Sequence, residues 1–242
     1  MRRKKNHPLP PFPHSGILLV DKPPDWTSHD VVNFIRNRFN IKKVGHCGTL
    51  DPAATGLLII VLGIMTKKSQ ELSGEDKTYT GTILFGKESD SQDMEGKIIA
   101  EKDASFLTEE TVIKAFDNMQ GEIKQIPPMV SAIKKNGKKL YELARQGKVI
   151  EREPRDITIH NIRTTKIYLP YCDFEVHCSK GTYVRTICHD IGQNLGCGAL
   201  LYNLRRIKSG NYSVQDAHFI DAIREWSQED LLNGLYGYKA YF

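Results

Sequence analysis

One short segment places a single carboxylate among small residues beside an apolar run. The segment GHCGTLDPAATG extends from Gly45 to Gly56, its only acid is Asp51, and LLIIVLG follows it directly. A carboxylate on a loop at the mouth of a buried strand suits a nucleophile or a general base, and small residues allow a ligand to approach closely. The alternative is that Asp51 only accepts hydrogen bonds in a turn before Pro52.

Arg185 is the candidate partner of that carboxylate. A guanidinium holds a carboxylate ionised and oriented through paired hydrogen bonds. Arg185 lies within the apolar run of Tyr183, Val184 and Ile187, a position that indicates a buried, paired cation. The alternative is an arginine at a helix edge that faces water.

Two tyrosines have neighbours that suit a nucleobase. Tyr79 follows Lys77 closely, and Tyr183 follows Lys180 and Gly181. Aromatic faces among cations are typical of sites that stack on bases. The alternative is that both rings belong to the core, as most aromatic side chains on strands do.

The cysteines and histidines do not form a recognisable metal or nucleophile pattern. There are five cysteines and no CxxC, which is typical of reduced thiols in a cytoplasmic protein. His46 and Cys47 are adjacent in sequence, and adjacent side chains rarely meet, so they do not predict a nucleophile pair. The pairs at 177–178 and 188–189 have the wrong spacing for zinc, and no metal is expected.

The apolar spacing predicts the elements that must position these residues. The segment 45–56 is expected to be a loop, and 57–63 a strand fit for the interior. Helices and strands are mixed along the chain and many of the predicted strands have antiparallel neighbours, which favours an α+β fold. Strands are predicted over 16–23, 57–63, 155–169, 171–181 and 199–214, and from 77 until a polar loop begins near 86; helices are predicted over 27–40, 67–72, 107–121, 182–196 and 219–226, and in the second half of 126–148 with Leu140, Leu143 and Ala144 inward.

Length and composition limit the class of protein. The 242 residues are enough for one large core or two small ones, and 26% charged residues argue against wholesale disorder. A net charge of +5 is weak support for a polyanionic partner. Residues 1–15 read as a basic, proline-rich arm without a signal sequence, and the longest apolar run, Leu57 to Leu62, is too short to span a bilayer. We therefore expect a cytoplasmic protein without a membrane partner.

Several segments in order resemble the TruB family of tRNA pseudouridine synthases. GHCGTLDPAATGLLIIVLG is similar to the central motif of the family, and CSKGTYVRTICHDIG to its arginine motif. The other similar segments are GILLVDKPPDWTSHDVV near the N-terminus, the tyrosine strand KTYTGTILFG, the RNA-gripping thumb IPPMVSAIKKNGKKLYELARQG and LRRIKSGNYSV at the end of the catalytic domain.

The resemblance implies a fold and an organisation. It implies the pseudouridine synthase fold, a mixed and largely antiparallel sheet flanked by helices and loops, in a single catalytic domain over 16–242. A thumb-like RNA-binding insertion is expected at about 126–150. Proteins of the family commonly carry a C-terminal PUA-type module, but only about 28 residues follow Val214, fewer than a domain needs. Either a short natural form or a trimmed chain accounts for this, and it argues against the guide-RNA-dependent relatives.

The resemblance also implies roles for individual residues. Asp51 matches the catalytic aspartate, Arg185 the arginine paired with it, and Tyr79 the tyrosine that stacks on the target base. His46 matches the histidine that helps to open the T loop and fills the space left by the flipped nucleotide. Tyr183 and Leu204 match further pocket residues; Lys180 and Gly181 are expected at the RNA, and Lys134, Lys135, Lys138, Lys139, Arg2–Lys5 and Arg205–Arg206 are expected to hold phosphates.

The implied activity is an RNA-uridine isomerase that converts uridine 55 in the T arm of tRNA to pseudouridine. The implied partner is tRNA, with no cofactor, no metal and no obligate protein partner, and a monomer is expected. Asp51 serves either as nucleophile or as stabiliser of an oxocarbenium-like state, and the sequence does not choose between them. A tRNA-folding chaperone and an enzyme with another target, such as ribosomal RNA, are the alternative functions.

Overall fold

A computed structural model of the chain describes residues 12–131, 133–135, 137–140, 143, 146–147 and 150–236. The chain forms two compact units. The first consists of residues up to Glu75 together with those from Arg205 on, and the second is Asp76–Leu204. The predicted arm lies largely outside the described residues, and so does its basic run Arg2–Lys5. The division into an arm over 1–15 and one domain over 16–242 stays a prediction.

The first unit is built on three strands with a buried centre. β1 (Gly16–Lys22) and β2 (Val44–Cys47) each pair antiparallel with β3 (Thr55–Leu62). The end of β12 (Ala199–Ser209) pairs parallel with the start of β3. β3 is an almost continuous apolar run and is buried along nearly its whole length, as expected for a strand covered on both faces. The unit also contains β13 (Tyr212–Ser213) beside β12, β14 (His218–Phe219) parallel to β1, and the 3₁₀ turn η2 (Val214–Asp216).

Helices flank this sheet where the sequence carries cap signals. α1 (Ser28–Arg38) begins with a capping box, in which Thr27 and Asp30 each accept from the other's backbone N–H. α1 packs its apolar face inward through Val31, Val32 and Ile35. The remaining helical segments of the unit are η1 (Gly63–Lys68), α2 (Ser69–Ser73), α6 (Ile220–Glu225) and α7 (Gln228–Asn233).

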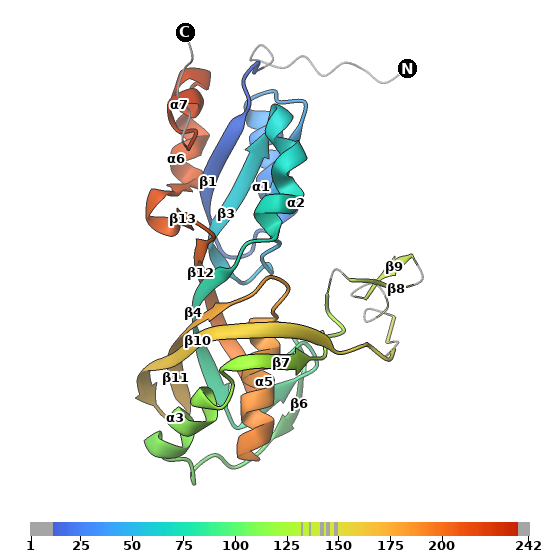
Figure 1. The fold of residues 1–242 in the computed structure, drawn as a ribbon, viewed down its shortest axis with the longest axis vertical. Coiled ribbons are helices and arrows are strands. Elements are labelled where there is room, and N and C mark those ends of the chain that lie inside the picture. The colour runs from blue at the N-terminus through green and yellow to red at the C-terminus, as the bar shows by residue number, and fades with distance from the viewer. Residues whose placement is uncertain are drawn as a thin grey trace. The chain divides into compact units, whose positions relative to one another are not determined.

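The second unit is an antiparallel sheet with two helices on one face (Figure 1). Four strands lie in the order β4 (Lys77–Phe85), β11 (Tyr171–Cys178), β10 (Arg155–Tyr168) and β7 (Gly121–Gln125), and the first part of β12 lies beside β4. α3 (Glu109–Asp117) and α5 (Val184–Leu195) pack together, and α3 covers β10. Two short hairpins join β5 (Lys87–Ser89) to β6 (Ile98–Glu101) and β8 (Lys134–Lys135) to β9 (Lys138–Lys139).

The α+β prediction is confirmed, and most predicted elements are present. The loop predicted over 45–56 is wrong at both ends, because β2 extends through Cys47 and β3 begins at Thr55. The polar loop after β4 contains β5, and neither β7 nor α7 was predicted. All three elements are short, and the two strands are also stabilised by pairing with other strands, which leaves little signal in the local sequence. In the thumb, Leu140 is buried and Leu143 half-buried, and Ala144 lies outside the described residues.

Within the described part of the chain, no helix has both the length and the apolar character needed to cross a bilayer.

The close packing of α5 against the start of β12 gives a test of the second unit. A Cβ on Gly192 would lie 2.1 Å from the backbone nitrogen of Ala199, so helix and strand approach backbone to backbone. We expect Gly192→Ala to lower the free energy of unfolding by about 3 kcal/mol or more. Urea denaturation followed by circular dichroism measures this. Asn194→Ala, an exposed change on the same helix, is the control, and equal stability of the two variants would contradict the expectation.

Candidate functional site

Asp51 is half-buried on the loop that joins β2 to β3, and the backbone of this loop is held at several points. The amide of Leu50 donates to the hydroxyl of Ser28 at 2.9 Å, and that hydroxyl donates back to the Leu50 carbonyl at 3.2 Å. The amide of Ala54 donates to the carbonyl of Asp51 itself at 3.1 Å. The expected loop acid is therefore carried on an ordered turn.

Lys22 binds the same loop from inside the first unit. Its ammonium donates to the carbonyls of Pro23, Trp26 and Pro52 at 2.8, 2.7 and 2.9 Å. Its side chain is fully buried, and burial lowers its pKa from 10.5 to about 8, although the nearby charge of Asp51 acts in the opposite direction. Lys22 thus places a positive charge near the catalytic candidate and fixes the residue that follows it.

Arg206 holds the two ends of the loop. Its guanidinium donates to the carbonyl of Leu57 at 2.7 Å and to that of Gly48 at 3.1 Å, and the residue is only 1% exposed. A Cβ on Gly56 would lie 2.3 Å from the Arg206 carbonyl, and its φ of +98° also favours glycine. The prediction that Arg206 holds a phosphate is therefore wrong, because its donors serve the loop.

Arg205 is also occupied by a partner within the protein. Its guanidinium makes a two-pronged ion pair with the buried carboxylate of Asp21, at 2.9 and 2.5 Å. The side chain remains partly exposed, but both terminal nitrogens already bind Asp21. A phosphate would have to compete with that ion pair.

His46 lies on β2, opposite Ile60 of β3. Burial lowers the pKa of its imidazole, and the nearby charges of Arg206 and His29 lower it further. Its Nδ1 is buried and has no hydrogen-bond partner among the described residues. These effects favour the neutral imidazole, which suits an aromatic insertion better than a contact with phosphate.

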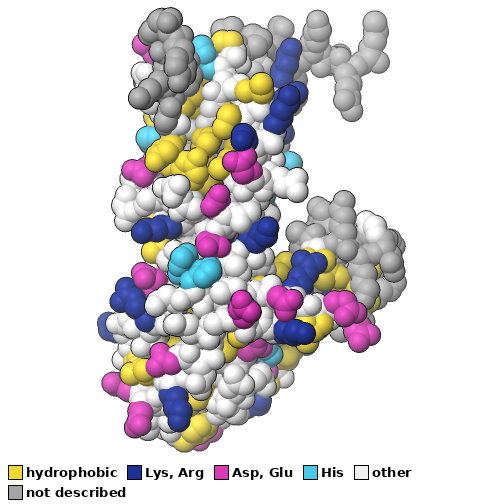
Figure 2. Space-filling model, viewed as in Figure 1, with side chains coloured by type: hydrophobic (Ala, Val, Ile, Leu, Met, Phe, Trp, Pro, Cys, Tyr) yellow, Lys and Arg dark blue, Asp and Glu magenta, His cyan; other side chains and the backbone are white. Residues whose placement is uncertain are grey.

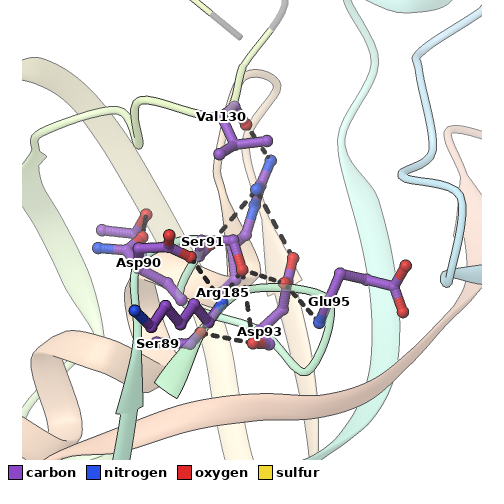
Figure 3. Close-up of polar contacts among 10 residues, drawn as sticks. Ser89, Asp90, Ser91, Asp93, Glu95, Val130 and Arg185 are labelled. Carbon is purple, nitrogen blue, oxygen red and sulfur yellow. Dashed lines mark hydrogen bonds and ion pairs between the residues drawn. The ribbon is translucent and has the colours of Figure 1, made fainter. Parts of the chain in front are cut away.

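Arg185 lies at the start of α5 in the second unit and is 3% exposed, which confirms the prediction of a buried cation. It donates to the carbonyls of Val130 at 2.7 Å and Ser91 at 3.4 Å (Figure 3). The carboxylate of Asp93 lies 3.6 Å from Nη1. The loop that supplies Ser91 and Asp93 is itself cross-linked, because the hydroxyls of Ser89 and Ser91 both donate to Asp93.

The two tyrosines differ in their surroundings. Tyr79 lies on β4 opposite Val176 and is 8% exposed, so it is part of the core as well as a stacking candidate. Tyr183 is the N-cap of α5 and is half-buried, with the Arg185 guanidinium 5.6 Å from its ring centroid. The buried amide of Gln125 fixes the backbone of Tyr183 through two hydrogen bonds of 2.8 and 3.1 Å.

The remaining RNA-binding candidates lie at the surface of the second unit or in the thumb. Lys180 and Gly181 are exposed in the turn before α5, and Leu204 is half-buried on β12. The backbone of the thumb pairs Lys134 with Lys139 and Lys135 with Lys138 in a hairpin, while the side chains of these lysines lie outside the described residues. On the face in view, Lys and Arg side chains are interspersed with Asp and Glu (Figure 2), so the net positive charge does not gather into a patch there.

The five cysteines all lie in the described part of the chain, where they are buried and form no disulfide. Burial raises the pKa of Cys172 and of Cys178 to about 12, and raises that of Cys188 as well. Such thiols are protonated and poorly reactive, so the sequence pairs at 177–178 and 188–189 have buried, structural cysteines.

The predicted site residues fall into both units. Asp51 and His46 lie in the first, and Arg185, Tyr79, Tyr183, Lys180, Gly181, Leu204 and the thumb lysines lie in the second. The pairing of Asp51 with Arg185 stays a prediction. Sequence reasoning did not predict the supporting roles of three residues: Lys22 and Arg206 at the Asp51 loop, and Asp93 beside Arg185. For Lys22, the sequence signal was its position at the end of the apolar run ILLVDK, which indicates a buried lysine.

The sequence matches two family models. Residues 36–184 match the N-terminal domain of the TruB family pseudouridylate synthases, and residues 185–235 match the C-terminal domain of tRNA pseudouridylate synthase B. The tRNA pseudouridine synthase B of Syntrophotalea carbinolica is 49% identical over 216 residues, which are 89% of this chain and 71% of that protein. The protein of the same name from Opitutus terrae is 49% identical over 208 residues, 86% of each chain.

Two solved structures are similar in fold. A Cbf5–Nop10–Gar1 complex aligns with a TM-score of 0.70 and 28% identity, over 91% of this chain and 56% of the other. An H/ACA RNP bound to a substrate RNA containing 2′-deoxyuridine aligns with a TM-score of 0.67 and 25% identity, over 92% of this chain and 56% of the other. This chain therefore spans just over half the length of these two neighbours.

The buried ammonium of Lys22 predicts a pH-dependent stability. Because its pKa is about 8 in the folded protein and 10.5 in the unfolded chain, the unfolded chain holds more protons between these values, and stability rises with pH across that window. Lys22→Met removes the titration and leaves three carbonyls without their donor, at a cost of about 2 kcal/mol near neutral pH. The difference in unfolding free energy between wild type and Lys22→Met should grow from about pH 8 to about pH 10. A difference that does not change with pH would contradict this.

The ion pair at Arg185 predicts a graded loss of stability. Asp93→Asn keeps the shape of the side chain but leaves the buried guanidinium without this carboxylate, and we expect a loss of about 2 kcal/mol in urea denaturation. Asp90→Asn is the matched control, because the carboxylate of Asp90, on the same loop, accepts from the backbone N–H of Lys97 at 2.9 Å, which an asparagine oxygen can also do. If both variants lose the same stability, Asp93 has no special role toward Arg185.

Proposed function

Since the chain belongs to the TruB family of pseudouridylate synthases, we propose that it isomerises uridine 55 in the T loop of tRNA to pseudouridine. The observation that carries this proposal is the fixed loop of Asp51, with Lys22 and Arg206 holding the carbonyls on either side of the acid. A catalytic carboxylate must be held in place before the substrate arrives, because misplacement of reacting groups is costly in rate.

Asp51 supplies the reactive carboxylate. The N1–C1′ bond of the uridine breaks, the uracil turns, and a C5–C1′ bond forms while the proton on C5 leaves. No atom of the nucleotide is lost, apart from exchange of that proton with water. The carboxylate either adds to the nucleotide or stabilises a positively charged sugar, as carboxylates do in glycosidases.

Arg185 is proposed to pair with Asp51 and keep it ionised. It is suited to this, because a buried guanidinium cannot lose its proton and has its other donors directed by Ser91, Val130 and Asp93. Tyr79 is proposed to stack on the target base, so that the detached uracil stays in place while it turns. Tyr183 and Leu204 would line the same pocket.

The uridine must leave its stack before the reaction, at a cost of a few kcal/mol. His46 is proposed to insert where the base was. Its ring is half-buried and its pKa is lowered by burial, which supports this proposal because a neutral imidazole stacks without bringing a charge among the bases. Lys180 and Gly181, and the thumb lysines Lys134, Lys138 and Lys139, are proposed to contact the RNA. We propose that the enzyme acts on tRNA in the cytoplasm, as a monomer.

A transcript carrying tritium at C5 of its uridines tests this function. Wild-type protein should release one equivalent of tritium per tRNA, and none from a transcript with cytidine at position 55. Asp51→Asn should lower the rate by at least about 10³-fold because the reacting group is lost, while tRNA affinity stays unchanged. Asp216→Asn, an exposed acid of the same unit, should retain full activity.

Two results would overturn the proposal. One is undiminished activity of Asp51→Asn. The other is release of tritium from the cytidine-55 transcript, which would point to another uridine. If Asp51→Asn still supports tRNA folding in a refolding assay, then a chaperone role is separate from the chemistry.

A further inference from the structure

The strands of the second unit bring together two imidazoles and a carboxylate that the proposed reaction does not use. The three residues are Asp76, His160 and His177, and one ligand atom of each lies within 4.8 Å of the other two. We propose that they form a binding site for a divalent transition-metal cation of the zinc class. This site does not depend on the proposed function.

Two paired strands and the residue before a third strand supply these side chains. Asp76 directly precedes β4, His177 lies near the end of β11, and His160 lies on β10. β11 pairs with both of the other strands, and His177 lies opposite Thr78 of β4. The three positions are far apart in sequence and show no regular spacing, so a search for chelating motifs does not find them.

A β-bulge brings the two histidines together. Ile159 lies opposite Cys178 and Asn161 lies opposite His177, so β10 has one extra residue, His160, at this point. Bulges redirect a side chain out of its regular alternation. The two imidazole rings consequently lie with their centroids 4.7 Å apart and tilted by 42°.

The distances suit a small cation. Nε2 of His160 is 3.0 Å from Oδ2 of Asp76. Around a tetrahedral zinc with bonds of about 2.0–2.1 Å, ligand atoms lie about 3.4 Å apart, so no separation between the ligand atoms needs to close by more than about 1.4 Å. Exposed and half-buried side chains on fixed strands can make that adjustment by small rotations about their χ angles.

The donor types select the class of metal. Two imidazoles and one carboxylate suit zinc, nickel or copper, whereas magnesium and calcium prefer oxygen ligands alone. The buried cysteines cannot compete for the metal without unfolding. Three protein ligands leave a fourth position for water. A bound cation would link β10 and β11 to the start of β4. Its ligand there, Asp76, lies three residues before Tyr79.

Calorimetric titration of the metal-free full-length chain with Zn²⁺ tests this site. We expect one equivalent to bind, and Co²⁺ in its place to show the visible absorption of a tetrahedral site. His160→Ala and His177→Ala should each weaken binding at least about tenfold. His29→Ala, which removes an exposed histidine of the first unit, is the matched control and should leave binding unchanged.

A thermal melt separates loss of the site from loss of the fold. In EDTA, all three variants should have the same melting temperature as wild type, because the altered side chains lie at the surface. Zn²⁺ should then raise the midpoint for wild type and His29→Ala alone, since a ligand of the folded state stabilises it. Absence of binding to wild type, or equal affinity of His160→Ala, His177→Ala and wild type, would overturn the proposal.

Discussion

Buried cations whose donors are satisfied by backbone carbonyls are the constraint on which both units depend. A buried ammonium or guanidinium is costly unless each of its N–H groups finds an acceptor. Lys22 meets that requirement with three carbonyls, and Arg206 meets part of it with two. Because a carbonyl belongs to the main chain, satisfying the cation also fixes the course of the loop that carries Asp51.

Arg185 follows the same pattern in the second unit. The carbonyls of Ser91 and Val130 accept hydrogen bonds from its guanidinium, and the carboxylate of Asp93 lies beside it. These groups come from two loops that are far apart in sequence. The cation therefore joins the segment after β5 to the segment after β7. In both units a positive side chain from a regular element organises irregular backbone, which is where functional groups are usually carried.

Local patterns in the sequence were sufficient for the longer elements. The helices predicted over 27–40, 107–121 and 182–196 are present as α1, α3 and α5. Thr27 and Thr108 are the N-caps of the first two and Gly196 is the C-cap of the third, and capping depends on a few neighbouring residues. The loop position of Asp51 and the burial of Arg185 could also be predicted, because their unusual neighbours are adjacent in the chain. Two strands, β2 and β7, could not be predicted, and neither could the supporting roles of Lys22, Arg206 and Asp93. All of these depend on partners that only the folded backbone brings near.

The burial of Lys22 also affects its chemistry as a nucleophile. An amine with a pKa of about 8 is partly neutral near physiological pH and would acylate faster than an ordinary lysine if reagents could reach it. Its side chain is fully enclosed, and its nitrogen is engaged by three carbonyls, one of them beside Asp51. Acylation of Lys22 therefore requires the loop to open, so its labelling rate is a chemical measure of how often the Asp51 loop leaves its place.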